Sequence, residues 1–377
     1  MDYKIGFIVE QALGHITHGQ NLRRNVAKDA SIHAYWGFPA FEVAGLGAII
    51  PGYRSNWTLR AGWQARQMLA EMQRKESLDI VFFHTQVTAT LAQDWLARMP
   101  GVVSLDATPH QYDTLGKSYD HRSGPPWLER WKWRLNRDCF RKARHLVAWS
   151  DWAKAGLVAD YDVIPDKVTV ISPGVNVREW TPSSLDRQTG ETIRILFVGG
   201  DFERKGGLIL LQAYRSLRQR ASLVKFQPRM DIELHLVTRQ AVPEEPGVFV
   251  YNHLDPNSEA LKSLFFSSHI FCLPTLGDCL PMVLSEAGAT GLPVVSTRVG
   301  AIEEIIRDGD TGILVPAGDC QALVDALQRL VIEPELRFRL GECAVELVRR
   351  EYDAETNAAR LIDLLKQVAD ENGHPRK

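Results

Sequence analysis

The stretch from Phe271 to Gly300, FCLPTLGDCLPMVLSEAGATGLPVVSTRVG, narrows the choice of fold more than any other part of the chain. It overlaps a continuously apolar run, Ile270–Pro274, that is typical of a parallel strand buried on both faces. Next come a turn containing Asp278, a helix expected to carry Glu286 one to two turns in, and a second strand. In an open α/β sheet ligands bind at the carboxyl ends of strands, where helix amino termini attract anions. This stretch therefore predicts a parallel α/β sheet with an anion-binding edge.

Strand patterns alternate with helix patterns along the whole chain, which predicts parallel sheets with helices on both faces. The length of 377 residues favours two domains, because a single core seldom grows beyond about 250–300 residues. In the first half, strands are expected at Tyr3–Val9, Ile80–Phe83, Val102–Leu105, His145–Ala148 and Val168–Ile171, with helices at Leu59–Lys75, Val87–Met99, Trp127–Arg141 and Asp151–Tyr161. In the second half, strands are expected at Arg194–Val198, Ile232–Val237, Val248–Tyr251, Ile270–Leu273, Val294–Thr297 and Ile313–Val315, with helices at Gly207–Arg220, Ser258–Ser267, Val283–Thr290, Ala322–Leu330, Pro334–Arg350 and Ala354–Val368.

Composition and the cysteines favour an intracellular globular protein. Apolar residues make up 45% and charged residues 24%, which is ordinary for a globular protein, and no apolar run approaches the ~20 residues that span a bilayer. The amino terminus lacks the features of an export signal. The five cysteines are odd in number and scattered, which argues against a disulfide framework or a zinc site. We therefore expect a cytoplasmic location.

Three motifs together resemble the family 4 glycosyltransferases. The first is the Asp278 to Glu286 spacing, followed by Gly-Leu-Pro-Val-Val at 291–295 and by Gly300. The second is Phe197-Val-Gly-Gly-Asp-Phe-Glu-Arg-Lys-Gly206, which looks like a strand, a phosphate loop and a lysine. The third is Asp-Gly-Asp-Thr-Gly-Ile-Leu-Val at 308–315. Together they cover most of residues 170–355, and they are specific as a set.

The resemblance implies the GT-B fold, in which two Rossmann-like domains face each other. The linker is expected at Ser172–Asn176, where proline and glycine interrupt both patterns. We expect an acceptor-binding domain at 1–172, a nucleotide-sugar domain at 173–353, and a helix and tail at 354–377 that cross back to the first domain.

The resemblance also implies a retaining hexosyltransferase that uses a UDP-, GDP- or ADP-sugar. Lys205 would contact the diphosphate, Glu286 the ribose hydroxyls, and Asp278 the donor sugar. Asp278 replaces the usual glutamate, and Gly200 stands where many members have an arginine, for which Arg204 is the candidate substitute. Retention through front-face attack, with the leaving phosphate helping to deprotonate the acceptor, requires no enzyme nucleophile. The donor-side candidates are Gly199, Gly200, Arg204, Lys205, Asp278, Cys279, Leu280, Pro281, Met282 and Glu286.

No cofactor beyond the donor and no essential metal are expected. Cations at the phosphate loop can stabilise the leaving diphosphate. The Asp308-Gly309-Asp310 sequence resembles a metal motif of another glycosyltransferase fold, but its position predicts a turn.

The acceptor side is expected at strand ends of the first domain. Its candidates follow three of the expected strands. Gly14, His15 and His18 follow the strand Tyr3–Val9, His84 follows Ile80–Phe83, and Asp106 and His110 follow Val102–Leu105. Asp106 is a candidate catalytic residue that would orient an acceptor hydroxyl, although capping a turn explains it as well. The His15/His18 spacing is expected to place the two rings on opposite sides of a turn, which is not a metal-like arrangement. The acceptor class stays open among glycolipid, polysaccharide and small glycoside.

Basic residues gather at Arg122–Arg144, which holds eight basic and two acidic residues interleaved with three tryptophans. One interpretation is a solvated helix face whose tryptophans, with Leu128, Trp131, Leu135 and Cys139 in one stripe, pack on the domain. The other is an interfacial helix that contacts anionic lipid at the inner face of a membrane. No nucleic-acid partner is expected.

Three alternatives to a transferase remain open. An epimerase of the same fold would need no acceptor. A dehydrogenase is disfavoured because Gln-Ala-Leu-Gly at 11–14 replaces a Gly-x-Gly-x-x-Gly motif after the first strand. A catalytically silent nucleotide-sugar-binding module is the third.

Overall fold

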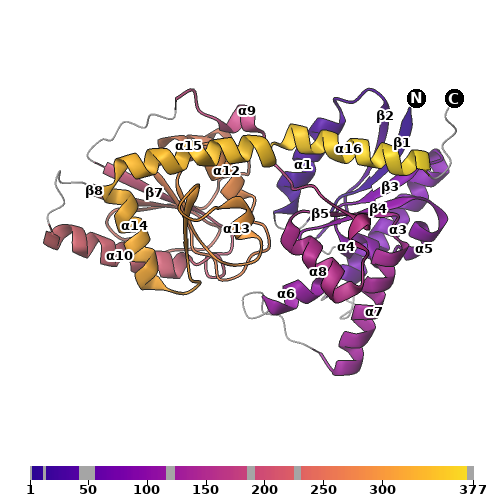
Figure 1. Ribbon diagram of the computed structural model, residues 1–377, viewed down its shortest axis with the longest axis horizontal. Coiled ribbons are helices and arrows are strands. Elements are labelled where there is room, and N and C mark those ends of the chain that lie inside the picture. Colours follow the sequence, from indigo (N-terminus) through magenta and orange to yellow (C-terminus); the bar gives the residue numbers. More distant parts are fainter. Residues whose placement is uncertain are drawn as a thin grey trace. The chain divides into compact units, whose positions relative to one another are not determined.

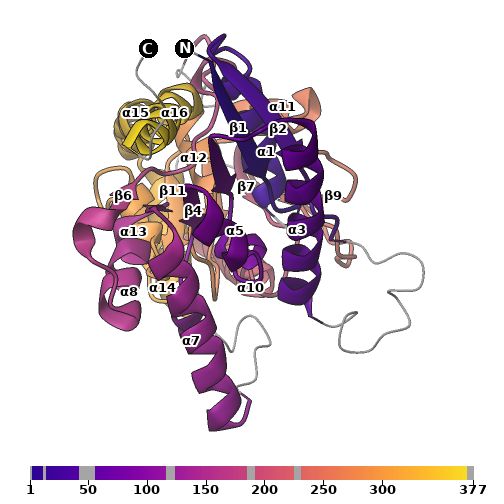
Figure 2. The ribbon, with the colours of Figure 1, turned by 90° about the vertical axis from the view of Figure 1, so that its right-hand side faces the viewer.

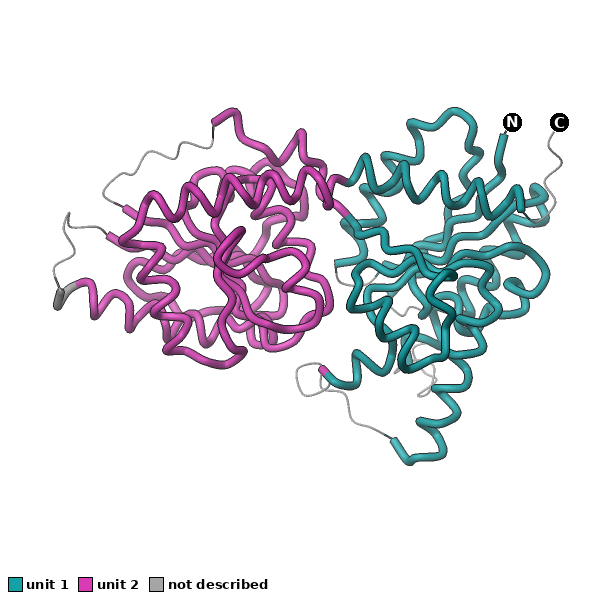
Figure 3. Tube along the Cα trace, viewed as in Figure 1, with its two compact units in different colours: residues 1–114, 121–173, 354–377 teal, residues 115–120, 174–353 magenta. Residues whose placement is uncertain are grey.

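The computed structural model describes residues 2–11, 14–41, 56–115, 124–184, 192–224 and 231–371. The chain forms two compact units (Figure 3). Unit 1 comprises Met1–Thr114, His121–Pro173 and Ala354–Lys377, and unit 2 comprises Leu115–Asp120 and Gly174–Asp353. Unit 1 is therefore discontinuous in sequence, because its last segment returns after unit 2 is complete.

Unit 1 is built on a six-stranded parallel sheet in the order β2-β1-β3-β4-β5-β6. Its strands are β1 (Tyr3–Ile8), β2 (Ile32–Gly37), β3 (Ile80–Phe83), β4 (Gly101–Leu105), β5 (His145–Ala148) and β6 (Val168–Val170). Its helices are α1 (His15–Val26), α3 (Trp57–Lys75), α4 (Gln86–Ala89), α5 (Gln93–Arg98), α6 (Pro109–Thr114), α7 (Pro126–Lys142), α8 (Asp151–Tyr161), the 3₁₀ turn η3 (Pro165–Lys167) and α16 (Ala354–Glu371) (Figure 1).

Helices cover both faces of the unit 1 sheet, which is why β3 and β4 are buried along their whole length. One face packs on α3, α7 and α8, with Leu69 and Phe140 among its buried side chains. The other face packs on α1 and α16, where Leu361 and Leu365 join Phe7 in a second core cluster. The last helix thus completes the core of unit 1, and this agrees with the expected crossing-back of the carboxyl-terminal segment.

Unit 2 repeats the plan with a six-stranded parallel sheet in the order β12-β11-β10-β7-β8-β9. Its strands are β7 (Thr192–Val198), β8 (Asp231–Val237), β9 (Val248–Tyr251), β10 (Ile270–Leu273), β11 (Val294–Thr297) and β12 (Gly312–Val315). Its helices are α9 (Val177–Trp180), α10 (Gly207–Val224), α11 (Glu259–Ser267), α12 (Val283–Ala289), α13 (Ile302–Ile305), α14 (Cys320–Ile332) and α15 (Pro334–Glu351).

The α/β class and all the expected strands are confirmed, and three details differ. The sequence analysis missed β2 and α1, and it also missed the short helices α6, α9 and α13. α1 is largely polar, and most side chains of β2 are only half-buried. A single helix at Val87–Met99 is wrong, because the segment forms the two short helices α4 and α5. Glu286 lies in the first turn of α12 rather than one to two turns in, although α12 begins at Val283 as predicted.

All five cysteines are free. Within the described part of the chain, no helix combines the length and the apolar character needed to cross a membrane.

Candidate active site

The first half of the predicted donor-side site is the loop between β7 and α10 in unit 2. β7 ends at Val198, and Gly199 and Gly200 lead into a turn that closes at Gly206. Gly206 has a φ of +80°, and a Cβ there would overlap the carbonyl oxygen of Pro274. Only glycine combines this conformation with this close approach. The loop is therefore pressed against the carboxyl end of β10.

Two hydrogen bonds hold the β7 loop to the residues after β10. The backbone N–H of Leu276 donates to the carbonyl oxygen of Arg204 at 2.8 Å, and the Thr275 hydroxyl donates to the same oxygen at 3.2 Å. Because β7 and β10 are neighbouring parallel strands, the cations of one loop and the carboxylate of the other lie at the same sheet edge.

Asp278 lies between two cations. Its carboxylate accepts a short hydrogen bond from the Lys205 ammonium, and the Arg204 guanidinium lies 3.8 Å from the same oxygen. Arg204 also donates to the Asp201 carboxylate at 3.0 Å and to the Gly277 carbonyl at 2.7 Å. The side chains of Arg204, Lys205 and Asp278 are only 11%, 16% and 11% exposed. Buried charges require such partners, so the cluster holds its two cations in place with acidic groups.

The turn after Asp278 is fixed by a second glycine. Gly300 has a φ of +56°, and a Cβ there would overlap the Asp278 carbonyl oxygen. The next residue, Ala301, donates its N–H to the Cys279 carbonyl at 2.8 Å. Cys279, Leu280 and Pro281 are buried, while Met282 is partly exposed and precedes α12. The loop after β11 therefore braces the backbone of the predicted sugar-side turn.

Glu286 is the carboxylate of α12. Its side chain forms no hydrogen bond or ion pair with a described residue, although the group is partly buried. Burial raises its pKa to about 7. A carboxylate in this state has unused acceptor capacity for ligand hydroxyl groups.

The Asp308-Gly309-Asp310 segment forms the predicted turn. The Asp308 carboxylate accepts from the Arg298 side chain at 2.5 Å and from the Leu314 N–H at 3.0 Å, and Gly309 has a φ of +77°. No cluster of three or more potential metal ligands occurs among the described residues.

In unit 1, three predicted histidines lie together. The His84 ring centroid is 5.3 Å from that of His15 and 4.8 Å from that of His18, and Trp149 lies 5.1–5.4 Å from all three. His15 and His18 are both in α1, three positions apart, so they share one side of that helix. The expectation that they point to opposite sides is therefore wrong. We call this group the histidine cluster.

Two members of the histidine cluster, His18 and His84, are uncharged at neutral pH. Burial is the main cause that lowers the pKa of His18 to about 3 and holds that of His84 well below its usual value. Both ring nitrogens of His84 and Nδ1 of His15 are buried and have no hydrogen-bond partner in the described residues. Buried polar atoms in this state are costly, and ligand hydroxyl groups could satisfy them.

The remaining acceptor-side candidates are arranged differently. Asp106 follows β4 and accepts from the Tyr112 hydroxyl at 2.6 Å, and burial raises its pKa. Gly14 precedes α1 in a helical conformation. His110 is exposed on α6, and the structure does not bring it into the histidine cluster.

Sequence reasoning missed Trp149 and Glu10. Trp149 directly follows β5, so the rule that sites form at strand ends could have identified it. Glu10 follows β1, and its carboxylate accepts from the Trp57 indole at 2.5 Å and from the Thr85 hydroxyl. These bonds join the ends of β1 and β3 to α3.

Comparisons with known proteins agree with this fold. Residues 28–179 match the family Glycosyltransferase Family 4, and residues 192–333 match the family Glycosyl transferases group 1. The chain is therefore a glycosyltransferase with the two-domain GT-B fold, and it belongs to the family 4 and group 1 type.

The chain is also similar to a curated relative and, in fold, to two solved structures. The D-inositol 3-phosphate glycosyltransferase of Corynebacterium efficiens is 28% identical over 337 residues, which cover 81% of this chain and 76% of that protein. Sucrose-phosphate synthase from Thermosynechococcus elongatus has a TM-score of 0.74 at 17% identity, covering 98% of this chain and all of the other. Anabaena HepE in complex with UDP-glucose has a TM-score of 0.69 at 16% identity, and the match covers 97% of this chain and 99% of that chain.

Proposed function

We propose that the enzyme transfers a hexosyl group from a nucleotide-diphosphate sugar to a hydroxyl acceptor with retention of anomeric configuration. The observation that carries this proposal is the pair of nearly buried cations, Lys205 and Arg204, that meet Asp278 where β7 and β10 end. A diphosphate needs such cations as it leaves, because negative charge grows on it in the transition state. UDP-hexoses are the first donors to test, since HepE has been solved with UDP-glucose.

Donor binding would exchange the partner of Lys205. In the structure the ammonium is paired with Asp278, so an incoming diphosphate competes with that carboxylate for the same cation. We propose that the diphosphate takes Lys205 and that Asp278 is released to accept hydrogen bonds from the donor sugar. Glu286, with its unused acceptor capacity, would receive the ribose hydroxyls.

The proposed chemical step needs no enzyme nucleophile. The bond between the anomeric carbon and the phosphate oxygen breaks, and the acceptor oxygen bonds to that carbon from the same face. The acceptor proton passes to the departing phosphate oxygen. In this scheme the protein positions both substrates and stabilises the leaving diphosphate.

We propose that the histidine cluster and Asp106 receive the acceptor. His84 and His18 are neutral, so this surface favours hydroxyl groups over a charged group. The acceptor class within this proposal is a glycolipid, a polysaccharide or a small glycoside. Five free cysteines fit a reducing compartment, and we propose a cytoplasmic site of action.

The test begins with a thermal-shift screen of UDP-, GDP- and ADP-sugars, because a bound donor raises the unfolding temperature. The stabilising donor is then supplied with candidate acceptors, and NMR determines the anomeric configuration of the product. We expect a glycoside with the donor's configuration, formed equally well after treatment with a chelator. An inverted product would refute the mechanism. A donor sugar that isomerises without transfer would identify an epimerase.

A further inference from the structure

The amino-terminal turns of α7 carry two large aromatic side chains that are mostly exposed. Trp127 is 70% exposed and Trp131 is 53% exposed. This end of α7 extends beyond the other elements of unit 1 (Figure 2). Exposed aromatic groups that adjoin on one surface indicate an interaction site more often than scattered ones do.

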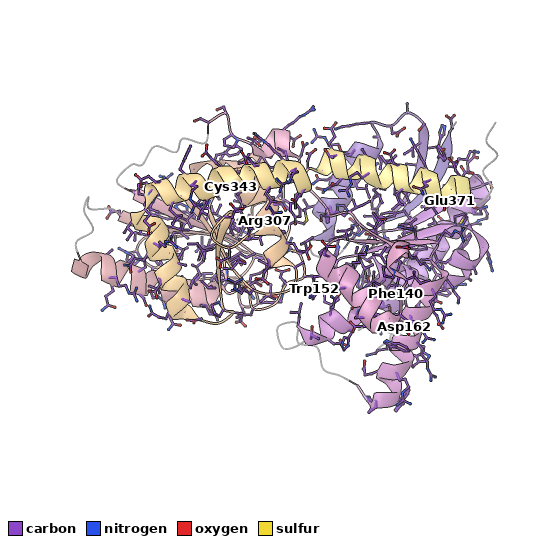
Figure 4. All side chains as sticks on the ribbon, viewed as in Figure 1. Phe140, Trp152, Asp162, Arg307, Cys343 and Glu371 are labelled. Carbon is purple, nitrogen blue, oxygen red and sulfur yellow. The ribbon has the colours of Figure 1, made fainter. Side chains whose placement is uncertain are left out.

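The carboxyl-terminal part of the same helix is anchored. The Trp133 indole donates to the Asp160 carbonyl at 2.8 Å, and the Arg137 guanidinium lies 4.7 Å from the Trp133 ring. Phe140 is fully buried, and Arg137 lies 3.9 Å from Asp162; Figure 4 labels both Phe140 and Asp162. The sequence analysis offered one interpretation in which the apolar stripe, including Trp131, packs on the domain. For Trp131 that interpretation is wrong, because its side chain is largely exposed.

The basic residues of this region differ in whether they form ion pairs. Arg130 and Arg134 are exposed and form no ion pair with a described residue. Lys132, by contrast, pairs with Glu129 at 2.9 Å. Arg122, where the basic segment begins, lies outside the described residues. Arg141, Lys142 and Arg144 at the carboxyl-terminal end are also exposed and form no ion pair with a described residue. Positive charge is therefore available at both ends of the segment, but only at the amino-terminal end does it adjoin the two exposed tryptophans.

Helical spacing places these four side chains on one side of α7. Counted from Trp127, the other three residues lie three, four and seven positions further along the helix; they are Arg130, Trp131 and Arg134. With Leu128 they line an open hollow of about 600 Å³. We call this surface the α7 tip.

We propose that the α7 tip docks the enzyme on an anionic lipid surface. Tryptophan suits the membrane interface because its ring is largely apolar while its N–H is polar. Arginine can extend its guanidinium to lipid phosphates while its stem covers apolar surface. Unpaired positive charge beside exposed tryptophan complements anionic headgroups. This proposal is independent of the donor chemistry.

Vesicle cosedimentation of the full chain tests this proposal without any need for turnover. We expect binding to vesicles that contain about one third phosphatidylglycerol, weak binding to phosphatidylcholine alone, and loss of binding as salt increases. Arg130→Gln with Arg134→Gln should lower the partition coefficient about fivefold per charge removed. Trp127→Ser with Trp131→Ser should lower it at least about tenfold.

Two matched control variants lie on α3 of the same unit. Trp63→Ser removes a tryptophan that is 55% exposed, and Arg74→Gln with Lys75→Gln removes two exposed charges. Both controls should bind vesicles as the wild type does, and circular dichroism checks that every variant is folded.

Several outcomes would overturn the proposal. One is wild-type sedimentation that is equal and negligible with both kinds of vesicle at low salt. Another is control variants that lose as much binding as the α7 variants. Tighter binding to single-stranded nucleic acid, or self-association in ultracentrifugation without vesicle binding, would identify a different partner if the α7 variants abolished it.

Discussion

Lys205 and Asp278 neutralise each other in the structure, so substitutions of the two should act in opposite directions on diphosphate binding. Lys205→Ala removes the cation, and we expect UDP to bind more weakly and kcat to fall about 10²–10³-fold. Asp278→Asn removes the competing anion, so UDP should bind severalfold more tightly while sugar transfer slows. Calorimetric titration with UDP and initial rates measure the two effects.

Arg215→Ala is the control for this pair, because Arg215 is an exposed cation of α10 whose ion pair with Glu245 lies in the same unit. It should leave both UDP affinity and kcat near the wild-type values. Weaker UDP binding by Asp278→Asn would contradict the proposed exchange of partners.

Glu286 should make donor affinity depend on pH near neutrality. Its pKa of about 7 in the folded protein lies above the ordinary value of 4.5, so it gains a proton as pH falls through 7. The carboxylate accepts hydrogen bonds more strongly than the acid does, and UDP-glucose affinity should therefore decrease from pH 8 to pH 6. The Glu286→Gln variant should bind UDP-glucose weakly at both pH values. A pH-dependence unchanged in Glu286→Gln would assign it to another group.

The raised pKa of Glu286 also determines whether the free energy of unfolding rises or falls with pH. Between pH 4.5 and about 7 the folded state binds more protons at Glu286 than the unfolded state does. The free energy of unfolding contributed by this group therefore falls as pH rises through that window. Glu286→Gln should lack this contribution, which denaturant titrations at several pH values would reveal.

Sequence patterns predicted which residues stand at strand ends, but not how those residues pair. The motifs put Lys205 and Asp278 after the ends of two strands, because both follow apolar runs, but the sequence did not show that these strands are neighbours. The ion pair between them depends on side-chain directions that a linear pattern does not contain. The histidine cluster was missed for a related reason, since three strand ends and α1 bring its members together.

At the scale of elements, the loops that we assign to the donor depend on two close approaches, at Gly206 and Gly300, that require glycine. Gly206→Ala would force a methyl group into the Pro274 carbonyl, so the β7 loop must move away from β10. We expect this variant to lose about 2 kcal/mol or more of stability and most of its donor affinity. Thermal unfolding with and without UDP measures both quantities.

Gly309→Ala separates backbone strain from steric overlap. Gly309 also has a positive φ, +77°, but no atom lies within 4 Å of the added Cβ. Its cost should be about 1 kcal/mol, from backbone conformation alone, with donor affinity unchanged. If Gly206→Ala and Gly309→Ala lost equal stability and equal donor affinity, the close approach of Gly206 to Pro274 would not be what the β7 loop depends on.

Elements with a strong apolar pattern were predictable, and those with a mixed pattern were not. The buried strands β3 and β10 are apolar throughout and were located correctly. β2 lies at a sheet edge with half-buried side chains, so its sequence, IHAYWG, has no strict period. Its strand conformation follows from pairing with β1, a long-range interaction that local reading does not capture.

At the scale of the whole molecule, the core of unit 1 is completed by the last segment of the chain. Leu361 and Leu365 of α16 are buried against Phe7 of β1, and the Asn357 side chain donates to the Ser172 carbonyl at 3.0 Å. The residues that we assign to the donor lie in unit 2. Damage to α16 should therefore affect unit 1 first and leave the donor loops intact.

A matched pair of core substitutions tests this separation. Leu365 in α16 and Leu340 in α15 are both fully buried, and each substitution to alanine should cost about 2–5 kcal/mol. Hydrogen exchange should then show Leu365→Ala weakening protection in β1 and β3, with UDP affinity unchanged. Leu340→Ala should weaken protection in β10 and β11, and UDP should restore it because a ligand stabilises the unit that binds it. If Leu365→Ala loosened both sheets equally, the two units would unfold as one cooperative body, and the donor loops would depend on the last helix despite being outside its unit.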